Sequence, residues 1–134
     1  MGVCMIKDLL KEIKKSSFSV IPVYLFIIAL IIMKIVTFTY KNFSINFNSQ
    51  MVFINECNIQ LTMIEYKIIE LLCKNAGKVL TYDYIQKCIN GPYISESNSS
   101  LRVHMANIRR KIEENPSEPK YIVTHVGVGY RFNI

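Results

Sequence analysis

The stretch that decides the fold spans residues 61–72 and has the sequence LTMIEYKIIELL. It opens with a capping box, in which the Thr62 hydroxyl accepts from the backbone N–H of Glu65 and the Glu65 carboxylate accepts from that of Thr62. Apolar residues then recur at helical spacing, and Gly77 stands just past the expected end of the helix. The apolar positions are Ile64, Ile68, Leu71 and Leu72. The pattern predicts a helix that packs one face against a core.

A second helix is expected directly downstream. Residues 78–80 are long enough only for a bridging strand, and Thr81 is placed to cap a helix that reaches about Ile89. The sequence Asn90-Gly91-Pro92 ends this helix, and a polar loop follows at 93–97. Its apolar side is expected to consist of Tyr84, Ile85 and Cys88.

A third and longer helix is predicted from about residue 98 to residue 114. Four apolar residues fall on one side of it and predict a face that packs on the core: Leu101, Met105, Ile108 and Ile112. The opposite face carries Ser99, Val103, Ala106, Asn107 and Arg110. Arg102 and Arg109 line one flank, and His104 and Lys111 line the other. The outer face is therefore small, polar and basic.

Short strands are predicted on both sides of the helices. Upstream, Phe43, Ile45 and Phe47 alternate with polar residues, and 51–54 and 57–61 are expected to complete an antiparallel meander. Downstream, 121–124 and 130–132 predict a hairpin around a turn that contains Gly127 and Gly129. The expected order is three strands, a helix, a strand, two helices and two strands, which is an α+β fold.

Composition narrows the function classes. The chain has 134 residues, with 16 Lys and Arg against 10 Asp and Glu and a net charge of +6, which permits a nucleic-acid or membrane-surface partner. Only two Asp and two His are present, and no catalytic or metal-ligand spacing occurs, so we expect neither an enzyme nor a cofactor or metal site. The cysteines form no C-x-x-C pair and are expected to be reduced, mostly buried thiols of a cytoplasmic protein. They are Cys4, Cys57, Cys73 and Cys88.

Residues 1–36 differ from the remainder of the chain. Residues 1–15 suggest a lysine-rich amphipathic helix, and residues 16–33 carry no charge, which reaches the lower limit of a transmembrane helix. The alternative is a buried or dimer-forming hydrophobic helix. The lysines before the run favour a cytoplasmic N-terminus, which would place the rest of the chain outside, away from DNA. Both alternatives stay open, with residues 1–36 as one unit and residues 37–134 as a folded domain.

The predicted order of elements in residues 37–134 is that of a winged helix-turn-helix with an N-terminal antiparallel sheet. A helix fits the major groove, small outer residues allow a close approach, and flanking Arg and Lys can contact phosphates. The alternative for the basic face alone is an ordinary solvated helix. The sequence therefore favours binding of double-stranded DNA.

Three spaced motifs also resemble a known family. They are LTMIEYKIIELL with NAGKVLT, then LRVHMANIRRKIE, then VGVGYRF at the end of the chain. Together they resemble the effector domain of OmpR/PhoB-type response regulators, the transcription factors of bacterial two-component (phosphorelay) systems. Gly91-Pro92 and the spacing from Arg109 to Glu113 are most similar to the KdpE subgroup, which regulates potassium-transport genes. The resemblance covers residues 38–134.

The resemblance implies a four-stranded N-terminal sheet, three helices and a C-terminal wing, and it also implies specific roles. The helix from residue 98 becomes the recognition helix and the terminal hairpin becomes the wing, which contacts the adjacent minor groove. DNA contacts are then expected from Ser99, Ser100, Arg102, Val103, His104, Ala106, Asn107, Arg109, Arg110 and Lys111 of the helix. The hairpin is expected to add Thr124, His125, Val126 and Tyr130. The loop after the second helix is expected to face RNA polymerase through Gly91, Pro92, Tyr93, Ile94, Ser95 and Glu96.

The sequence also departs from that family. Many relatives have arginine where Ala106, Asn107 and Val126 stand, so a different sequence preference and a weaker insertion into the minor groove are expected. Only 36 residues precede the domain, which leaves no room for a phosphorylated receiver. We therefore expect an orphan effector, or the product of a truncated gene, that binds DNA as a weak monomer or dimer. The alternative function is a membrane-anchored or truncated interaction protein that keeps the winged-helix fold without regulated DNA binding.

Overall fold

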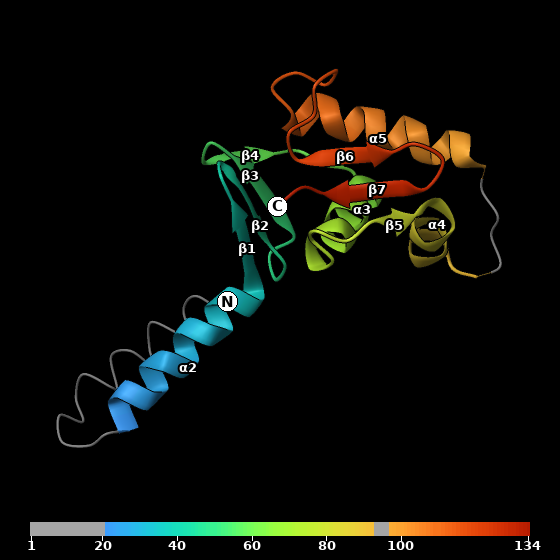
Figure 1. The fold of residues 1–134 in the computed structure, drawn as a ribbon. Coiled ribbons are helices and arrows are strands. Elements are labelled where there is room, and N and C mark those ends of the chain that lie inside the picture. The colour runs from blue at the N-terminus through green and yellow to red at the C-terminus, as the bar shows by residue number, and fades with distance from the viewer. Residues whose placement is uncertain (1–20, 93–96) are drawn as a thin grey trace.

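The structure is a computed structural model that describes residues 21–92 and 97–134. The amphipathic helix expected at 1–15 and the loop residues Tyr93, Ile94, Ser95 and Glu96 lie outside the described residues. The elements, shown in Figure 1, are α2 (Ile21–Val36), β1 (Thr37–Tyr40), β2 (Phe43–Asn46), β3 (Met51–Ile54), β4 (Cys57–Ile59), α3 (Met63–Lys74), β5 (Leu80–Thr81), α4 (Tyr82–Asn90), α5 (Asn98–Ile112), β6 (Ile122–His125) and β7 (Gly129–Phe132).

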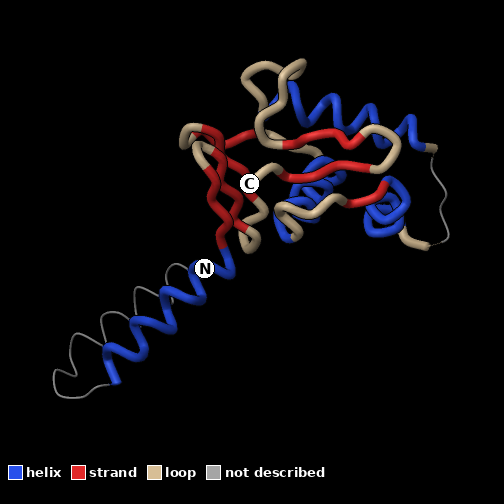
Figure 2. Tube along the Cα trace, viewed as in Figure 1, coloured by secondary structure: helices blue, strands red, loops and turns tan. Residues whose placement is uncertain are grey.

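The N-terminal sheet is an antiparallel meander of four strands in the order β1-β2-β3-β4 (Figure 2). The expected strands at 43–47, 51–54 and 57–61 correspond to β2, β3 and a shorter β4. The residue pattern did not predict β1, because Thr37–Tyr40 follows the apolar run without a turn signal. Its pairing of Phe38 with Ile45 continues the sheet directly from the end of α2.

The capping box at the start of α3 is present as predicted. The Glu65 N–H donates to the Thr62 hydroxyl at 3.3 Å, and the Thr62 N–H donates to a Glu65 carboxylate oxygen at 3.0 Å. The expected apolar stripe is only partly right, because Ile64 is 37% exposed and Leu71 is half-buried. The helix is buried over a wider arc than one stripe, since it packs against α4, α5 and β7. Its buried apolar residues are Tyr66, Ile68, Ile69, Leu72 and Cys73.

Helix α4 confirms its predicted cap and corrects its predicted apolar side. The N–H of Tyr84 donates to the Thr81 hydroxyl at 3.2 Å. Ile85 is buried, whereas Tyr84 is 46% exposed and Cys88 is exposed. A helix of nine residues meets α3 and α5 through one narrow face, which Ile85 occupies with the half-buried Ile89.

The expectation of mostly buried cysteines is wrong for the described part of the chain. Cys73 is buried, but Cys57 and Cys88 are exposed, and all three are free thiols. Burial raises the pKa of the Cys73 thiol, which keeps it protonated near neutral pH.

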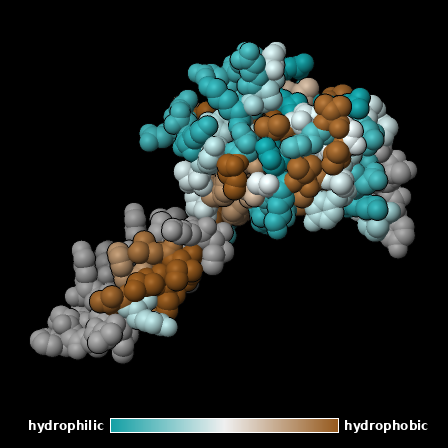
Figure 3. All heavy atoms as spheres, viewed as in Figure 1, coloured by the Kyte–Doolittle hydropathy of each residue, from teal (hydrophilic) through white to brown (hydrophobic). Residues whose placement is uncertain are grey.

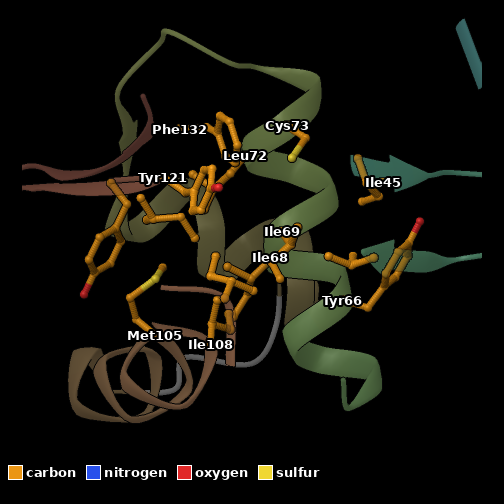
Figure 4. Packing of buried hydrophobic residues seen from close by; sticks show 14 of the residues in the cluster. Ile45, Tyr66, Ile68, Ile69, Leu72, Cys73, Met105, Ile108, Tyr121 and Phe132 are labelled. Carbon is orange, nitrogen blue, oxygen red and sulfur yellow. The ribbon is translucent and has the colours of Figure 1, made fainter. Parts of the chain in front are cut away.

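The predicted stripe of α5 forms the centre of the core. Leu101, Met105, Ile108 and Ile112 are at most 3% exposed. Figure 4 shows Met105 and Ile108 pointing toward Ile68 of α3, while Tyr121 and Phe132 close the core beside Leu72. Three helices and two sheets therefore share one hydrophobic core.

The second sheet has the order β5-β7-β6 and includes the predicted terminal hairpin. Gly129 lies where β7 pairs with β5, opposite Thr81, and a Cβ there would lie 1.7 Å from the Leu80 carbonyl oxygen. Only glycine fits this position. Gly127 has a φ of +76°, which a tight turn requires and glycine adopts without strain. The hairpin of β6 and β7 is called the wing below.

Helix α2 extends away from the domain (Figure 1), and the face of it seen in Figure 3 is mostly apolar. From 23 to 32 every side chain is exposed except the half-buried Ala29. The helix is joined to the sheet by β1 and by a hydrogen bond from the Phe47 N–H to the Val36 carbonyl at 2.9 Å. None of the helices among the described residues combines the length and the apolar character that crossing a membrane requires.

Candidate nucleic-acid interface

The outer face of α5 is open to solvent. Val103 is 58% exposed, and Ser99, Arg102 and Ala106 are also exposed. Arg102 has no hydrogen bond or ion pair to any residue in the described ranges. This face therefore combines small side chains with an unpaired cation, the arrangement expected of a helix that approaches a nucleic acid closely.

Asn107 and Arg110 form a pair on the same face. The Arg110 guanidinium donates to the Asn107 side-chain oxygen at 3.3 Å. Asn107 is half-buried and Arg110 is exposed, so the pair lies at the edge of the core with its outer side in solvent. The Asn107 side chain thus lies on the outer face beside Arg110, and an asparagine in such a place can bond adenine through its oxygen and its nitrogen.

Arg109 is turned toward the wing. Its Nη2 donates to the Ile122 carbonyl at 3.1 Å and to the Thr124 hydroxyl at 2.6 Å. Its guanidinium carbon lies 5.7 Å from the centre of the Tyr130 ring. Two of the residues expected to contact DNA, Arg109 and Thr124, are thus bonded to each other.

Lys111 is turned toward α3. Its Nζ lies 2.6 Å from a carboxylate oxygen of Glu65, the capping-box residue, which is 3% exposed. Burial alone would raise the pKa of Glu65, but the hydrogen bonds from Lys111 and the Thr62 backbone, with the Lys111 charge, lower it below its ordinary value. Lys111 is therefore occupied by an ion pair that connects α5 to α3.

His104 and Ser100 lie at the side of α5 that meets the other helices. His104 is half-buried and borders a small cavity of about 10 Å³. The cavity is also lined by Ile64, Ile68, Gln86, Ile89, Asn90 and Leu101. The Ser100 N–H donates to the Ser97 carbonyl at 3.0 Å within the first turn of the helix. The structure does not group these two residues with the exposed face around Val103.

The tip of the wing is the most exposed part of the candidate interface. Val126 is 91% exposed and Val128 is 49% exposed. His125 is half-buried at the base of the turn. Tyr130 is only 3% exposed, and its pKa is raised, chiefly by burial. The structure brings Val126 to the surface and keeps Tyr130 beneath Arg109 and against Tyr82, whose ring centre lies 5.4 Å away.

The sequence reasoning missed the role of Glu113. This carboxylate is 7% exposed and accepts from three consecutive backbone N–H groups, those of Lys120 and Tyr121 at 2.8 Å and Ile122 at 3.0 Å. It therefore fixes the start of β6 to the end of α5. The only signal in the sequence is a glutamate at the end of the helix, two residues before the Asn115-Pro116 turn.

The loop expected to face RNA polymerase begins at the end of α4. Gly91 caps the helix with a φ of +83°, and Pro92 is exposed. Gln86 of α4 donates to the Asn98 side chain at 3.2 Å, which joins the two helices on either side of the loop. The described ends of the loop are thus held close to α5.

A helical core whose last helix carries an exposed polar face, followed by a β-hairpin at its flank, defines the winged helix-turn-helix class of DNA-binding domains. Comparison with known proteins agrees with this class. Residues 55–132 match the model of the family described as "Transcriptional regulatory protein, C terminal". The match covers more than half of the chain, and the chain belongs to this family.

Curated relatives include KdpE proteins. The chain is 32% identical over 93 residues to the KDP operon transcriptional regulatory protein KdpE of Escherichia coli K12, a match covering 69% of this chain and 41% of that protein. It is 40% identical over 97 residues to KdpE of Staphylococcus aureus, covering 72% and 42%. The chain thus spans about two fifths of the length of these relatives.

Solved structures show the same fold. The response regulator DrrB of Thermotoga maritima, an OmpR/PhoB homologue, superposes with a TM-score of 0.68 at 30% identity, covering 73% of this chain and 44% of DrrB. The DNA-binding domain of the response regulator AdeR, solved in complex with an intercistronic region, gives a TM-score of 0.59 at 28% identity, covering 71% and 96%. The expected family and the α+β winged-helix fold are confirmed.

Proposed function

We propose that residues 37–134 bind double-stranded DNA sequence-specifically and regulate transcription, with α5 in the major groove and the wing at the adjacent minor groove. The observation that carries this proposal is the exposed outer face of α5, which is polar and basic while its opposite face is the centre of the core. The family membership and the DNA-bound structure of the similar AdeR domain support it.

The exposure and bonding of each candidate residue indicate whether it would face bases, contact phosphates or position other elements. Val103, Ala106 and Asn107 would face base edges, because Val103 and Ala106 are exposed and Asn107 lies on the same face beside Arg110. Arg102, Arg110 and Ser99 would contact phosphates. Arg109, Lys111 and Thr124 are already bonded within the protein, so their contribution to DNA contacts would run partly through the placement of α5 and the wing.

The partners beyond DNA are also proposals. Gly91 and Pro92 begin the loop that, by resemblance, would face RNA polymerase. The relatives named KdpE regulate transcription, and a regulator of bacterial genes would act in the cytoplasm, where the DNA is. The family membership supports binding as the proposed activity.

Selection from a random duplex library tests this function. The full chain is expected to enrich one motif, and the chain carrying Val103→Glu, which places a negative charge on the exposed outer face, is expected to enrich none. A matched substitution far from α5, Lys67→Glu on the exposed side of α3, should leave the motif unchanged. A library that shows no enrichment with the unchanged chain at low salt would contradict the proposal.

A further inference from the structure

Two side chains one helical turn apart connect α5 to the first strand of the wing. Glu113 accepts from the backbone N–H groups of Lys120, Tyr121 and Ile122 and so holds the start of β6. Arg109 donates to the Ile122 carbonyl and the Thr124 hydroxyl and so holds its middle. Arg109 lies in the last turn of α5 and Glu113 is its C-cap residue, so both act at the end of the helix that adjoins the wing.

The contacts of Arg109 also involve the second strand of the wing. Its guanidinium lies over the ring of Tyr130, which is buried in β7, and its Nε is buried without a partner in the described part of the chain. Thr124 and Tyr130 are partners in the β6–β7 register. The Arg109 side chain therefore contacts both strands of the wing at the same level of the hairpin.

The wing has few other connections to α5. Beyond the level of Thr124 the hairpin consists of His125, the Gly127 turn and the exposed Val126 and Val128. No hydrogen bond or ion pair joins these tip residues to α5 within the described ranges. The tip is held on its other side by α4, because the Tyr82 N–H donates to the Val128 carbonyl at 3.2 Å. The placement of the wing relative to α5 is therefore set at its base, where Arg109 and Glu113 are bonded.

We propose that Arg109 is a positioning residue that fixes the wing relative to the recognition helix, so that both elements meet their two grooves as one rigid unit. The effect of Arg109 on DNA contacts rests on the proposed DNA binding. The bonds by which Arg109 holds the wing, called the tether below, are a property of the free protein. The tether differs from a phosphate contact, for which charge alone would suffice. A lysine at this position would keep the charge but cannot reproduce the two bonds of one guanidinium nitrogen together with the planar contact on Tyr130.

The first test is hydrogen exchange of the free full chain. Arg109→Gln, Arg109→Lys and Thr124→Val are each expected to speed exchange of the β6 and β7 amides roughly tenfold, while amides of α3 keep their protection. The matched control is Arg110→Gln, because Arg110 is exposed and bonds only Asn107 among the described residues. It should leave wing exchange unchanged. Wing exchange equal to that of the unchanged chain in all three variants would overturn the tether.

The second test compares two duplexes that share the selected motif, one of full length and one shortened by about five base pairs on the wing side, half a helical turn. Arg109→Lys is expected to weaken binding to the full duplex about tenfold and to leave binding to the short duplex and the salt dependence unchanged. Arg110→Gln should weaken both equally and lower the salt slope by about one. Equal losses on both duplexes with Arg109→Gln, together with unchanged binding by Arg109→Lys, would show that Arg109 is a phosphate ligand and overturn the inference.

The two failures are distinguishable. If the unchanged chain binds neither duplex at low salt, the proposed function is contradicted, and with it the predicted effect of Arg109 on DNA binding. The exchange measurement needs no DNA and still decides whether Arg109 holds the wing.

Discussion

Helices α2 and α5 are almost equal in length, with 16 and 15 residues, but they have opposite relations to the fold. Helix α2 is apolar on all sides and exposed, whereas α5 is apolar on one side and forms the centre of the core. Figure 3 shows the apolar surface of α2 apart from the mostly polar surface of the domain.

The difference shows that apolar content alone does not place a helix in a core. The four buried residues of α5 recur at helical spacing, so they form one continuous stripe that can meet α3 and the wing. Helix α2 has no polar face to direct it, and none of its described residues belongs to the core cluster. The domain therefore has a complete core without it.

The largest difference between α5 and α2 is expected in the free energy of unfolding after an Ile→Ala substitution in each helix. Ile108→Ala removes a side chain that is 0% exposed and should lower the free energy of unfolding by about 2–5 kcal/mol. Ile31→Ala in α2, where the side chain is 52% exposed, should lower it by less than about 0.5 kcal/mol. Urea denaturation of both variants measures the difference. Similar losses would mean that α2 is part of the core.

The next effect concerns sequence preference. Asn107→Ala should relax the preference at one base pair by about 1–3 kcal/mol, because an asparagine can bond adenine with both side-chain groups. Tyr24→Ala on the exposed surface of α2 is the control and should leave the preferred motif intact. Selection from a random duplex library with each variant provides the measurement. A motif that survives Asn107→Ala unchanged would show that Asn107 does not contact bases.

A smaller effect tests the ion pair that ties α5, but not α2, to the domain. Glu65→Gln should destabilise the fold at pH 7 by about 1–2 kcal/mol. The pKa of Glu65 is lowered in the folded state, so its contribution is present above its ordinary pKa of 4.5 and is lost as the pH falls through the lowered value. The difference between the variant and the unchanged chain should therefore shrink below pH 4.5. Glu114→Gln, whose side chain is 85% exposed, is the control and should show little change in stability at any pH.

The smallest effect on stability is expected from removing residues 1–36. The truncated chain loses the hydrogen bond from Phe47 to Val36, about 0.5–1.5 kcal/mol, and should keep cooperative melting. Its yield without detergent should rise, because exposed apolar surface promotes aggregation. Thermal melting of the full and truncated chains checks this. A truncated chain that melts without cooperativity would place α2 within the fold.

The sequence predicted the features that local physics determines. The capping box of Thr62 and Glu65, the buried stripe of α5 and the Gly127 turn each follow from short-range spacing, and the structure contains all three. Strand β1 was missed in the residue pattern because its pairing with β2, and not its own four residues, determines that it is a strand.

Tertiary contacts explain the remaining differences. Tyr84 and Cys88 have the right spacing for burial, but no element of the described part of the chain covers that side of α4. The bonds of Arg109 to β6 and of Lys111 to Glu65 join residues 13 to 46 positions apart, and no periodicity reports such pairs. The list of basic residues was therefore predictable, whereas their division into exposed and internally bonded cations was not.

The central claim is that α5 and the wing bind duplex DNA through exposed cations, and a salt titration tests it most directly. The affinity of residues 37–134 for a duplex that carries the selected motif would be measured between about 50 and 200 mM salt. The logarithm of the affinity should fall linearly with the logarithm of the salt concentration, with a slope of roughly −2 to −4 for a few neutralised phosphates. An affinity that does not change with salt, or no binding at low salt, would contradict the account.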